Sequence, residues 1–458
     1  MKSVALHNLG CKVNAYEIDV MQQMLQENGY IIVPFDEKAD IYIVNTCSVT
    51  NIADRKSRQM LHKAKKMNPE AIVVATGCYV QTGKEALEAD TSIDLAIGNN
   101  RKKEIVKIIE EYMEHHTAQD AIIDINHTDE YEEMSLKQTA DHTRAYIKIQ
   151  DGCNQFCSYC IIPYARGRVR SRDAQNILAE INGLVAAGYQ EVVLTGIHIS
   201  SYGIDFVEKD SDDYLNAQTH NAKDIAQRKG YLLSLIQQIH QIEGIKRIRI
   251  GSLEPRIITE EFAAALCRLS KVCPHFHLSL QSGCDETLKR MNRHYSAGEY
   301  YEKVELLRRY FDHPAITTDV IVGFPEESEQ EFLTTKEFLD KIQFYEMHIF
   351  KYSKREGTVA AAMKNQVLDT VKMQRSNELL SMEKKQSEEF RAYYLNQVEE
   401  VLFEEEKVIE GKHYWIGHTR QYVKVAVQSE ENLSNRIKCG KIEEFLQKDI
   451  MLMTRIIS

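Results

Sequence analysis

Three features are missing from this sequence of 458 residues, and each absence excludes a class of protein. No run of apolar residues approaches the roughly 18 that a membrane-spanning helix requires. The chain reaches Gly10 too soon to provide the apolar region of a signal peptide, so we expect a cytoplasmic protein. Positive charge is not in excess: 57 Lys and Arg face 68 Asp and Glu, so any binding to nucleic acid must come from local patches.

The ten cysteines do not form the pattern of a small secreted protein, which favours a reducing compartment. Three of them, Cys153, Cys157 and Cys160, have the spacing C-x3-C-x2-C directly after an alternating apolar run. Three thiolates this close can bind one four-iron cluster and leave its fourth iron without a protein ligand. A structural zinc site is the alternative, but zinc prefers a fourth Cys or His nearby, and the next cysteine is Cys267.

This loop, with the aromatic Tyr159 before its last cysteine, resembles the cluster-binding loop of the radical S-adenosylmethionine (SAM) enzymes. The resemblance implies a [4Fe-4S] cluster whose open iron binds the amino and carboxylate groups of SAM. It also implies that an electron passed to this cluster cleaves SAM to methionine and a 5′-deoxyadenosyl radical. In such enzymes the cofactor carries the chemistry and the protein positions it.

Strand and helix patterns alternate in residues 1 to 115. Apolar runs at Val4 to Leu9, Ile41 to Val44 and Ala71 to Ala75 are separated by helical patterns, which predicts a parallel sheet covered by helices. The pattern is typical of a flavodoxin-like domain. Residues 116 to 140 are polar, acidic and without period, and we expect a linker there.

Three further cysteines, Cys11, Cys47 and Cys78, each lie just past the carboxyl end of a strand predicted in this first domain. Open α/β sheets build their sites at this edge, so these thiols can meet and bind a second cluster, again with one iron free. The alternative is three buried core thiols, since cysteine often behaves as a small apolar residue. Core thiols are expected inside strands, and this favours the cluster.

Two cysteine triads in one chain restrict the resemblance to a smaller group of radical SAM enzymes. The segments Gly10 to Glu17, Asn45 to Thr50 and Gly77-Cys78 resemble the N-terminal domain of the methylthiotransferases, radical SAM enzymes that insert sulfur and methylate it. Cys-Lys-Val-Asn, which starts at Cys11, is similar to the enzymes that act on N6-threonylcarbamoyladenosine (t6A) in tRNA. Enzymes for isopentenyladenosine typically have Cys-Gln-Met-Asn there, and those for a ribosomal protein have Cys-Pro-Lys-Asn.

Strand and helix patterns alternate again in residues 141 to 370. They begin with Tyr146 to Ile149 and end with Glu346 to Ile349, about six βα units in all. The pattern predicts an open (β/α)6 partial barrel, the radical SAM core, with its site at the carboxyl ends of the strands. Residues 204 to 230 are a polar insertion whose composition predicts a loosely packed loop.

The loops of this barrel contain phrases that resemble methylthiotransferase segments, among them Leu194 to His198, Gly251 to Arg256 and Thr318 to Glu326. The resemblance implies that Gly196 lets the backbone approach the amino group of SAM. The cofactor-binding residues that it implies are Tyr159, Gly196, Ser252, Asp319 and Gly323. As alternatives, each glycine serves only a turn and Asp319 only pairs with a neighbour.

Four arginines alternate in the segment after the cysteine loop: Arg166, Arg168, Arg170 and Arg172. If the segment is extended, its period of two places all four guanidinium groups on one side. Such a row suits phosphate oxygens of RNA or a carboxylate, because arginine is a planar donor of several hydrogen bonds. The alternative is a solvated loop.

Residues 371 to 396 form a charged helical connector, and short strand-like runs follow in residues 397 to 458. These runs predict a small OB-like β-barrel. The segment Gly417 to Tyr422 resembles the TRAM domain, an RNA-binding module of tRNA-modifying enzymes, which implies RNA contacts from Arg420 and Tyr422. Because Glu404 to Glu406 repel phosphate, RNA must approach another face.

Taken together, the resemblance implies a transferase that converts t6A at position 37, in the anticodon loop of tRNA, to 2-methylthio-t6A. One SAM would supply the radical that removes the C2 hydrogen of adenine. The Cys11/Cys47/Cys78 cluster would hold the sulfur that a second SAM methylates. A flavodoxin or ferredoxin electron donor and a sulfur donor are also implied. The alternatives are an enzyme for isopentenyladenosine or a ribosomal protein, and a non-catalytic iron-sulfur protein that binds RNA.

Overall fold

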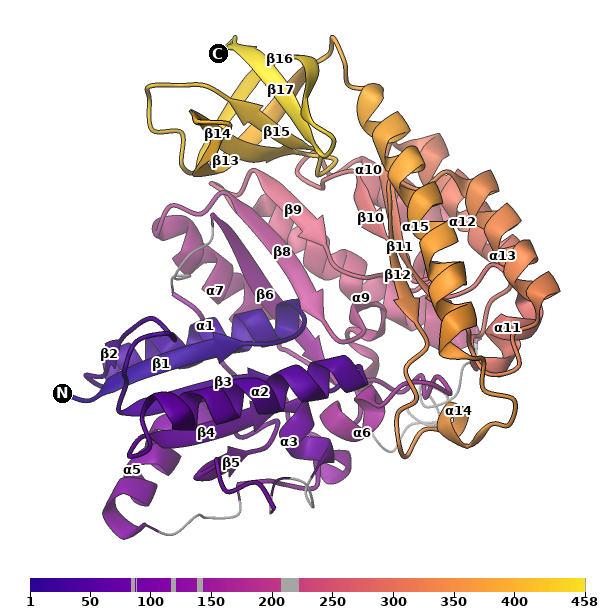
Figure 1. Ribbon diagram of the computed structural model, residues 1–458. Coiled ribbons are helices and arrows are strands. Elements are labelled where there is room, and N and C mark those ends of the chain that lie inside the picture. Colours follow the sequence, from indigo (N-terminus) through magenta and orange to yellow (C-terminus); the bar gives the residue numbers. More distant parts are fainter. Residues whose placement is uncertain (84–86, 88, 117–120, 138–142, 207–221, 458) are drawn as a thin grey trace.

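The computed structural model describes residues 1–83, 87, 89–116, 121–137, 143–206 and 222–457. An α/β domain at the N-terminus lies beside the strand β6 of a central half-barrel (Figure 1). A small β-barrel at the C-terminus lies over the end of the half-barrel where Arg144 of β6 pairs with Glu404 (Figure 1). In the described part of the chain, no helix has the length and apolar character needed to cross a membrane.

The N-terminal domain is a parallel sheet with the strand order β2-β1-β3-β4-β5, which is the flavodoxin-like order that the sequence predicts. The central strand β3 is buried at every position, as expected for a parallel sheet covered on both faces. Its elements are β1 (Ser3–Asn8), α1 (Lys12–Glu27), β2 (Ile31–Ile32), β3 (Ile41–Thr46), α2 (Asn51–Met67), β4 (Ile72–Gly77), α3 (Cys78–Thr82), β5 (Leu95–Ile97), η1 (Lys102–Glu104) and α5 (Ile105–His115).

The segment expected to be a linker is well packed in its described part, residues 121–137. Ala121 bridges Ile97 of β5, and η2 (Ile125–His127) follows. Met134 and Leu136 are buried in the core of the N-terminal domain. The polar composition therefore belongs to a segment that covers the domain, and its few apolar residues anchor it.

The half-barrel contains six parallel strands, as predicted. Strands β6, β8 and β9 form one set and β10, β11 and β12 another, and single bridges such as Leu253 to Leu278 join the two. Its elements are β6 (Arg144–Asp151), α6 (Ile162–Arg166), β7 (Arg170–Ser171), α7 (Ala174–Ala186), β8 (Glu191–Gly196), η3 (Ile199–Ser201), η4 (Ile204–Phe206), α9 (Ala222–Gln241), β9 (Arg247–Ile250), η5 (Pro255–Ile257), α10 (Glu260–Cys267), β10 (His275–His277), α11 (Asp285–Arg290), α12 (Ala297–Tyr310), β11 (Ala315–Val322), α13 (Glu329–Ile342), β12 (Glu346–Lys351) and α14 (Val359–Ala362).

The predicted insertion at residues 204 to 230 is described only at its two ends. It starts with the short helix η4, and α9 already begins at Ala222. The prediction of a loop is therefore wrong for its final part, which is helical, and residues 207–221 lie outside the described residues.

Helix α15 (Asp369–Ala392) runs along the half-barrel and leads into a closed β-barrel with the strand order β13-β14-β15-β17-β16 (Figure 1). This confirms the predicted small barrel. Its strands are β13 (Val398–Ile409), β14 (Lys412–Thr419), β15 (Lys424–Val427), β16 (Arg436–Gln447) and β17 (Ile450–Ile456). The sequence pattern missed β16, because charged residues interrupt its apolar ones.

Candidate active site

Cys11, Cys47 and Cys78 follow β1, β3 and β4 at one edge of the N-terminal sheet, as the sequence predicts. The three thiols lie close enough to influence one another: burial and the neighbouring Cys78 raise the pKa of Cys47 to about 12, and Cys11 adds to this effect. Cys47 and Cys78 are buried, whereas Cys11 is exposed. Three convergent thiols with one open side fit a cluster that keeps one iron free of protein ligands.

A glycine fixes the loop that carries the third thiol. Gly77 has φ +99°, and a Cβ at this position would lie 2.5 Å from the carbonyl oxygen of Thr46. Since an L-residue disfavours this φ and no Cβ tolerates so short a contact, only glycine lets Cys78 approach the end of β3. The two cysteine loops can meet here because Gly77 has no side chain.

Gly77→Ala should therefore cost the protein about half of its reconstituted iron and destabilise it by about 1–3 kcal/mol through backbone strain. Iron per chain after anaerobic reconstitution and the free energy of unfolding measure the two effects. Gly183→Ala in α7 is the matched control, because a Cβ there meets nothing within 4 Å. It should keep all the iron and gain up to about 1 kcal/mol of helix stability. A full iron content in Gly77→Ala would contradict this role of Gly77.

Cys153, Cys157 and Cys160 lie in the loop that follows β6, at the carboxyl ends of the half-barrel strands. The Cys153 amide donates to the carbonyl of Gly167 (3.0 Å), which holds the start of the loop. Burial and the other two thiols raise the pKa of Cys160. Arg293 Nη1 donates to Cys157 Sγ (3.2 Å), so a cation lies in direct contact with this sulfur.

The spacing of the thiols argues against zinc. In the described residues, one set of three Cys, His, Asp or Glu side chains has all its ligand atoms within 4.8 Å of one another, and this set contains no cysteine: His277, Asp319 and His348. Thiolates that share one tetrahedral zinc would lie about 3.8 Å apart. The wider cysteine triads fit the larger iron-sulfur clusters.

A buried network of charges joins the two cysteine sites. Glu17 of α1 forms ion pairs with Lys102 (2.5 Å), Lys148 (2.8 Å) and Arg166 (2.5 Å). Arg166 also pairs with Asp151 (3.1 Å). Burial by itself would raise the pKa of Glu17, but the three cations outweigh burial and hold this pKa well below the usual value of 4.5.

Arg166 also links this network to the thiols of the N-terminal domain. Its Nε donates to Cys78 Sγ (3.4 Å), so a cation of the half-barrel faces a cysteine of the other site.

The structure corrects the interpretation of the four alternating arginines. The prediction of RNA contacts is wrong for Arg166, Arg170 and Arg172, which are at most 1% exposed and bind carboxylates or carbonyl oxygens of the protein. Of the four, only Arg168 is exposed.

A cavity of about 650 Å³ lies where the N-terminal domain, the half-barrel and the C-terminal barrel meet. Three of the residues predicted to bind SAM, Gly196, Ser252 and Asp319, line it together with Cys11. The cavity therefore connects the predicted cofactor site with the exposed thiol of the first triad. Its size suits a small molecule or a single nucleotide.

Two predicted cofactor residues lie elsewhere. Gly323 faces helix α15, where a Cβ would lie 2.3 Å from Lys372 Cγ, and its amide donates to Glu327 Oε2 (2.6 Å). Tyr159 packs edge-on against Phe324, with 6.4 Å between ring centroids. Neither is among the residues that line this cavity: Gly323 packs against α15 and Tyr159 against Phe324.

The two residues predicted to contact RNA from the C-terminal barrel instead join it to the half-barrel. Arg420 donates to the carbonyl oxygens of Ser270 and Val272. Tyr422 lines the cavity, stacked on His275 and His418 (ring centroids 5.1 and 4.4 Å apart). The predicted RNA contact is thus contradicted for Arg420, whose guanidinium binds backbone carbonyls, whereas Tyr422 faces the cavity rather than the outer surface.

Sequence reasoning missed much of the cavity lining, because those residues lie on separate elements without a common motif. Lys12 stands next to Cys11, in a segment that carries the family resemblance. The missed residues include Lys12, Arg144, Tyr146, Arg249, His275, His277 and His348.

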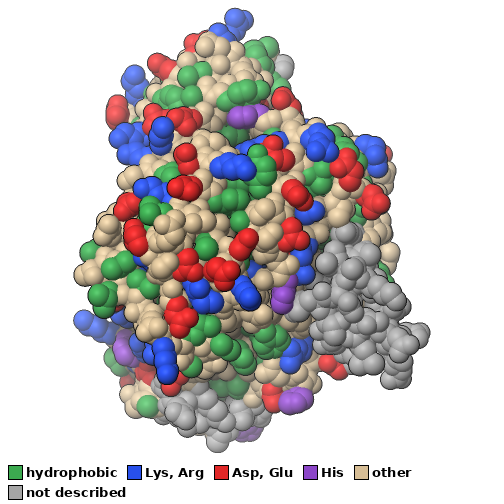
Figure 2. Space-filling model, turned by 90° about the vertical axis from the view of Figure 1, so that its right-hand side faces the viewer, with side chains coloured by type: hydrophobic (Ala, Val, Ile, Leu, Met, Phe, Trp, Pro, Cys, Tyr) green, Lys and Arg blue, Asp and Glu red, His purple; other side chains and the backbone are tan. Residues whose placement is uncertain are grey.

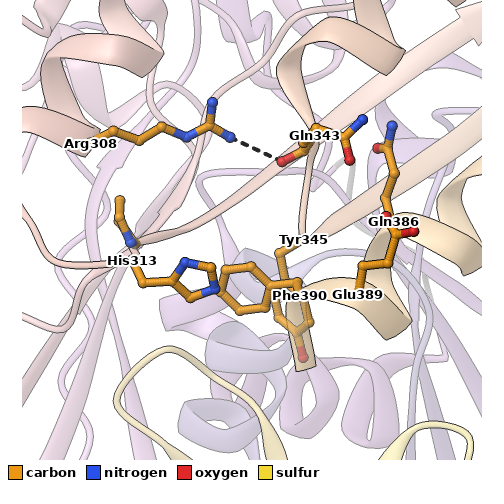
Figure 3. Close-up of a pocket in the computed structure, with 8 residues that line it drawn as sticks. Arg308, His313, Gln343, Tyr345, Gln386, Glu389 and Phe390 are labelled. Carbon is orange, nitrogen blue, oxygen red and sulfur yellow. Dashed lines mark hydrogen bonds between the residues drawn. The ribbon is translucent and has the colours of Figure 1, made fainter. Parts of the chain in front are cut away.

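A second cavity, of about 450 Å³, lies between α12, α13 and α15 (Figure 3). Arg308 donates to the carbonyl of Gln343 (3.0 Å) along the dashed line in Figure 3, and the His313 ring stacks on Phe390 (4.4 Å between centroids). The contact between His313 and Phe390 fixes α15 to the half-barrel. No residue that the sequence predicts for the site lines this cavity.

Comparison with known proteins identifies relatives of this chain. The family model "Uncharacterized protein family UPF0004" matches residues 3–98, and that of the radical SAM superfamily matches residues 147–339. The threonylcarbamoyladenosine tRNA methylthiotransferase MtaB of Bacillus subtilis is 39% identical, over 96% of this chain and 94% of its own. A tRNA-2-methylthio-N(6)-dimethylallyladenosine synthase of Thermoanaerobacter sp. is 36% identical, over 87% of this chain and 81% of its own.

Solved structures agree with the fold. The radical SAM methyltransferase TsrM from Kitasatospora setae, with cobalamin and a [4Fe-4S] cluster bound, has a TM-score of 0.54 and 15% identity, and the match covers 76% of this chain and 72% of that one. This likeness concerns the fold alone. Identity of 39% to MtaB over nearly the whole of both chains, with both cysteine triads assembled, means that this chain belongs to the tRNA methylthiotransferases, radical SAM transferases that use SAM and [4Fe-4S] clusters.

Proposed function

We propose that the protein converts t6A at position 37 of tRNA to 2-methylthio-t6A. The observation that carries this proposal is the identity to MtaB of Bacillus subtilis, which extends over 96% of the chain and includes the N-terminal domain and the C-terminal barrel. Conversion of isopentenyladenosine is the second candidate, because a relative that is 36% identical is a dimethylallyladenosine synthase.

When bound, the two clusters and SAM supply the radical and the methylthio group of the reaction. In this proposal Cys153, Cys157 and Cys160 hold one cluster, and Cys11, Cys47 and Cys78 hold the other. Arg293 and Arg166 donate to one sulfur of each triad and so stabilise its negative charge. The cavity residues bind and orient the substrates.

The domain limits that we propose are residues 1–115 for the N-terminal domain, 116–140 for the connection, 141–370 for the radical SAM core, 371–396 for the helical connector and 397–458 for the TRAM-like domain. The proposed partners are the anticodon loop of tRNA, a flavodoxin or ferredoxin as electron donor and a sulfur donor, in the cytoplasm. Acidic and basic side chains are mixed over the face shown in Figure 2, so this face offers no large basic patch to tRNA. Among the four predicted arginines, the exposed Arg168 is the candidate for contact with tRNA phosphates.

Mass spectrometry of tRNA nucleosides tests the substrate. A strain that lacks the gene should lose 2-methylthio-t6A and accumulate t6A, while 2-methylthio-isopentenyladenosine stays unchanged. Re-expression of the protein should restore the lost nucleoside, and re-expression of Cys47→Ala should not. Loss of the isopentenyl product instead would favour the second candidate and contradict our proposal.

A further inference from the structure

One end of the 650 Å³ cavity is lined by cations. Lys12 from the first turn of α1, Arg144 from β6 and Arg249 from β9 line it, and Tyr422 of the C-terminal barrel lies with them. The Tyr422 ring lies under both guanidinium groups, 4.9 Å from Arg144 and 4.8 Å from Arg249. Three chain segments that are far apart in the sequence thus bring positive charge to one place.

These cations lie away from the radical SAM cysteines. Arg144 is the first residue of β6, and the cysteine loop begins after Asp151, the last residue of that strand. Seven steps along a strand span about 23 Å. Gly196 and Ser252 of the same cavity lie at the carboxyl ends of their strands, nearer to that loop. The cavity therefore has a cofactor end and a cationic end.

Lys12 is the cation of this group that has no carboxylate in direct contact, although the charge of the more distant Glu191 acts on it. Arg144 pairs with Glu404 (3.2 Å) and Arg249 with Glu191 (2.7 Å). Within the described ranges, no Asp or Glu lies within ion-pair distance of Lys12, and its side chain is exposed to the cavity. A partly enclosed cation without a counter-ion favours an anionic ligand.

We propose that Lys12, supported by Arg144 and Arg249, binds the carboxylate of the threonylcarbamoyl group and so selects t6A over neutral adenosine derivatives. This inference rests on the proposed function. The substrate carries one carboxylate, on the N6 substituent, and an isopentenyl group carries none. On the adenine ring, C2 and N6 lie on different edges, so C2 can face the cofactor end while the N6 substituent extends to the cationic end. A neutral ligand would leave the cation desolvated and unpaired, which gives discrimination.

Lys12→Gln tests the inference. With an anticodon stem-loop RNA that carries t6A, kcat/KM for methylthiolation should fall at least about 10-fold, since a partly buried charge pair is lost. Iron content and the yield of 5′-deoxyadenosine without RNA should stay at the wild-type values. Lys12→Arg should recover most of the activity. Lys384→Gln removes the same charge from an exposed position on α15 and should behave like the wild type.

A stem-loop in which the threonine carboxylate is a methyl ester separates the carboxylate from an RNA phosphate as the ligand. If Lys12 binds the carboxylate, the ester should react poorly with the wild type, and Lys12→Gln should lower that rate no further. An equal loss for the t6A and ester substrates in Lys12→Gln would show a phosphate contact and overturn the inference.

Binding of the free nucleoside gives a readout that does not depend on turnover. By calorimetry, t6A should bind the wild type at least about 10-fold more tightly than its methyl ester, and Lys12→Gln should remove this preference. If the wild type fails to convert t6A but shows this preference, the proposed function fails and the carboxylate site stands. If the wild type converts t6A and shows no preference, the carboxylate site fails and the function stands.

Discussion

Cys157→Ala should abolish the reductive cleavage of SAM, with 5′-deoxyadenosine falling to the background of a reaction without protein. Cys157 is one of three thiols in the loop after β6, and its sulfur accepts a hydrogen bond from Arg293. Two remaining thiols cannot hold a cluster that requires three. The iron content should fall from about eight to about four atoms per chain, because the second site is intact.

Cys47→Ala is the complementary variant. Its iron content should also fall to about four atoms per chain. Because Cys47 belongs to the N-terminal triad, the variant should still cleave SAM but should form no methylthio product. Cys439→Ala, in β16 of the C-terminal barrel, is the control thiol and should leave iron, cleavage and product unchanged. The assays use dithionite and SAM without oxygen. Methylthio product formed by Cys47→Ala would refute the separate roles of the two sites.

Glu17→Gln should be the most destabilising single change in the charge network, by about 3–5 kcal/mol, because it leaves three buried cations with too few carboxylates. The free energy of unfolding in urea measures this effect, at equal iron loading. Glu27→Gln, which breaks the exposed pair with Lys137, is the matched control and should cost less than about 1 kcal/mol. Comparable losses in the two variants would contradict the buried network.

The difference in the free energy of unfolding between the wild type and Glu17→Gln depends on pH, because the pKa of Glu17 is lowered in the folded protein. A carboxylate whose pKa is lower in the folded state stabilises the fold fully above its unfolded pKa of 4.5 and loses this contribution as the pH falls towards the folded value. The gap between the wild type and Glu17→Gln should therefore be constant from about pH 6 to 8 and narrow below about pH 4.5. If this difference in the free energy of unfolding widened at low pH, it would contradict the assignment of Glu17 as an ionised carboxylate in the folded protein.

The two cysteine triads could be predicted because the rule for parallel sheets and the spacing in the loop are both local. The strands that carry them are apolar runs, as in β3, where all six residues are buried. The arginine row shows the limit of such reasoning. Arg166 faces Glu17, which is 149 positions earlier in the chain, so its burial depends on a contact that no local pattern contains.

Residues at the junctions of the three parts were the least predictable. Tyr422 belongs to a sequence segment that resembles an RNA-binding module. Its ring nevertheless lines the cavity, because the C-terminal barrel packs on the half-barrel. Gly323 stands in a barrel loop but faces Lys372 of α15, a helix that the barrel pattern does not include. Lys12 follows a cysteine whose chemistry was recognised, and its own importance emerged only with Arg144 and Arg249 beside it.

Glu17 of the first domain pairs with Lys148 and Arg166 of the half-barrel, so the two domains have to evolve together. A chimaera that takes residues 1–115 from a relative without this acid would leave the two half-barrel cations to share the carboxylate of Asp151, whereas a donor that carries the acid would be accepted. Exchange of first domains between relatives is therefore permitted only when both sides of the pairing match, and new substrate preferences should arise by substitution within one lineage more readily than by recombination.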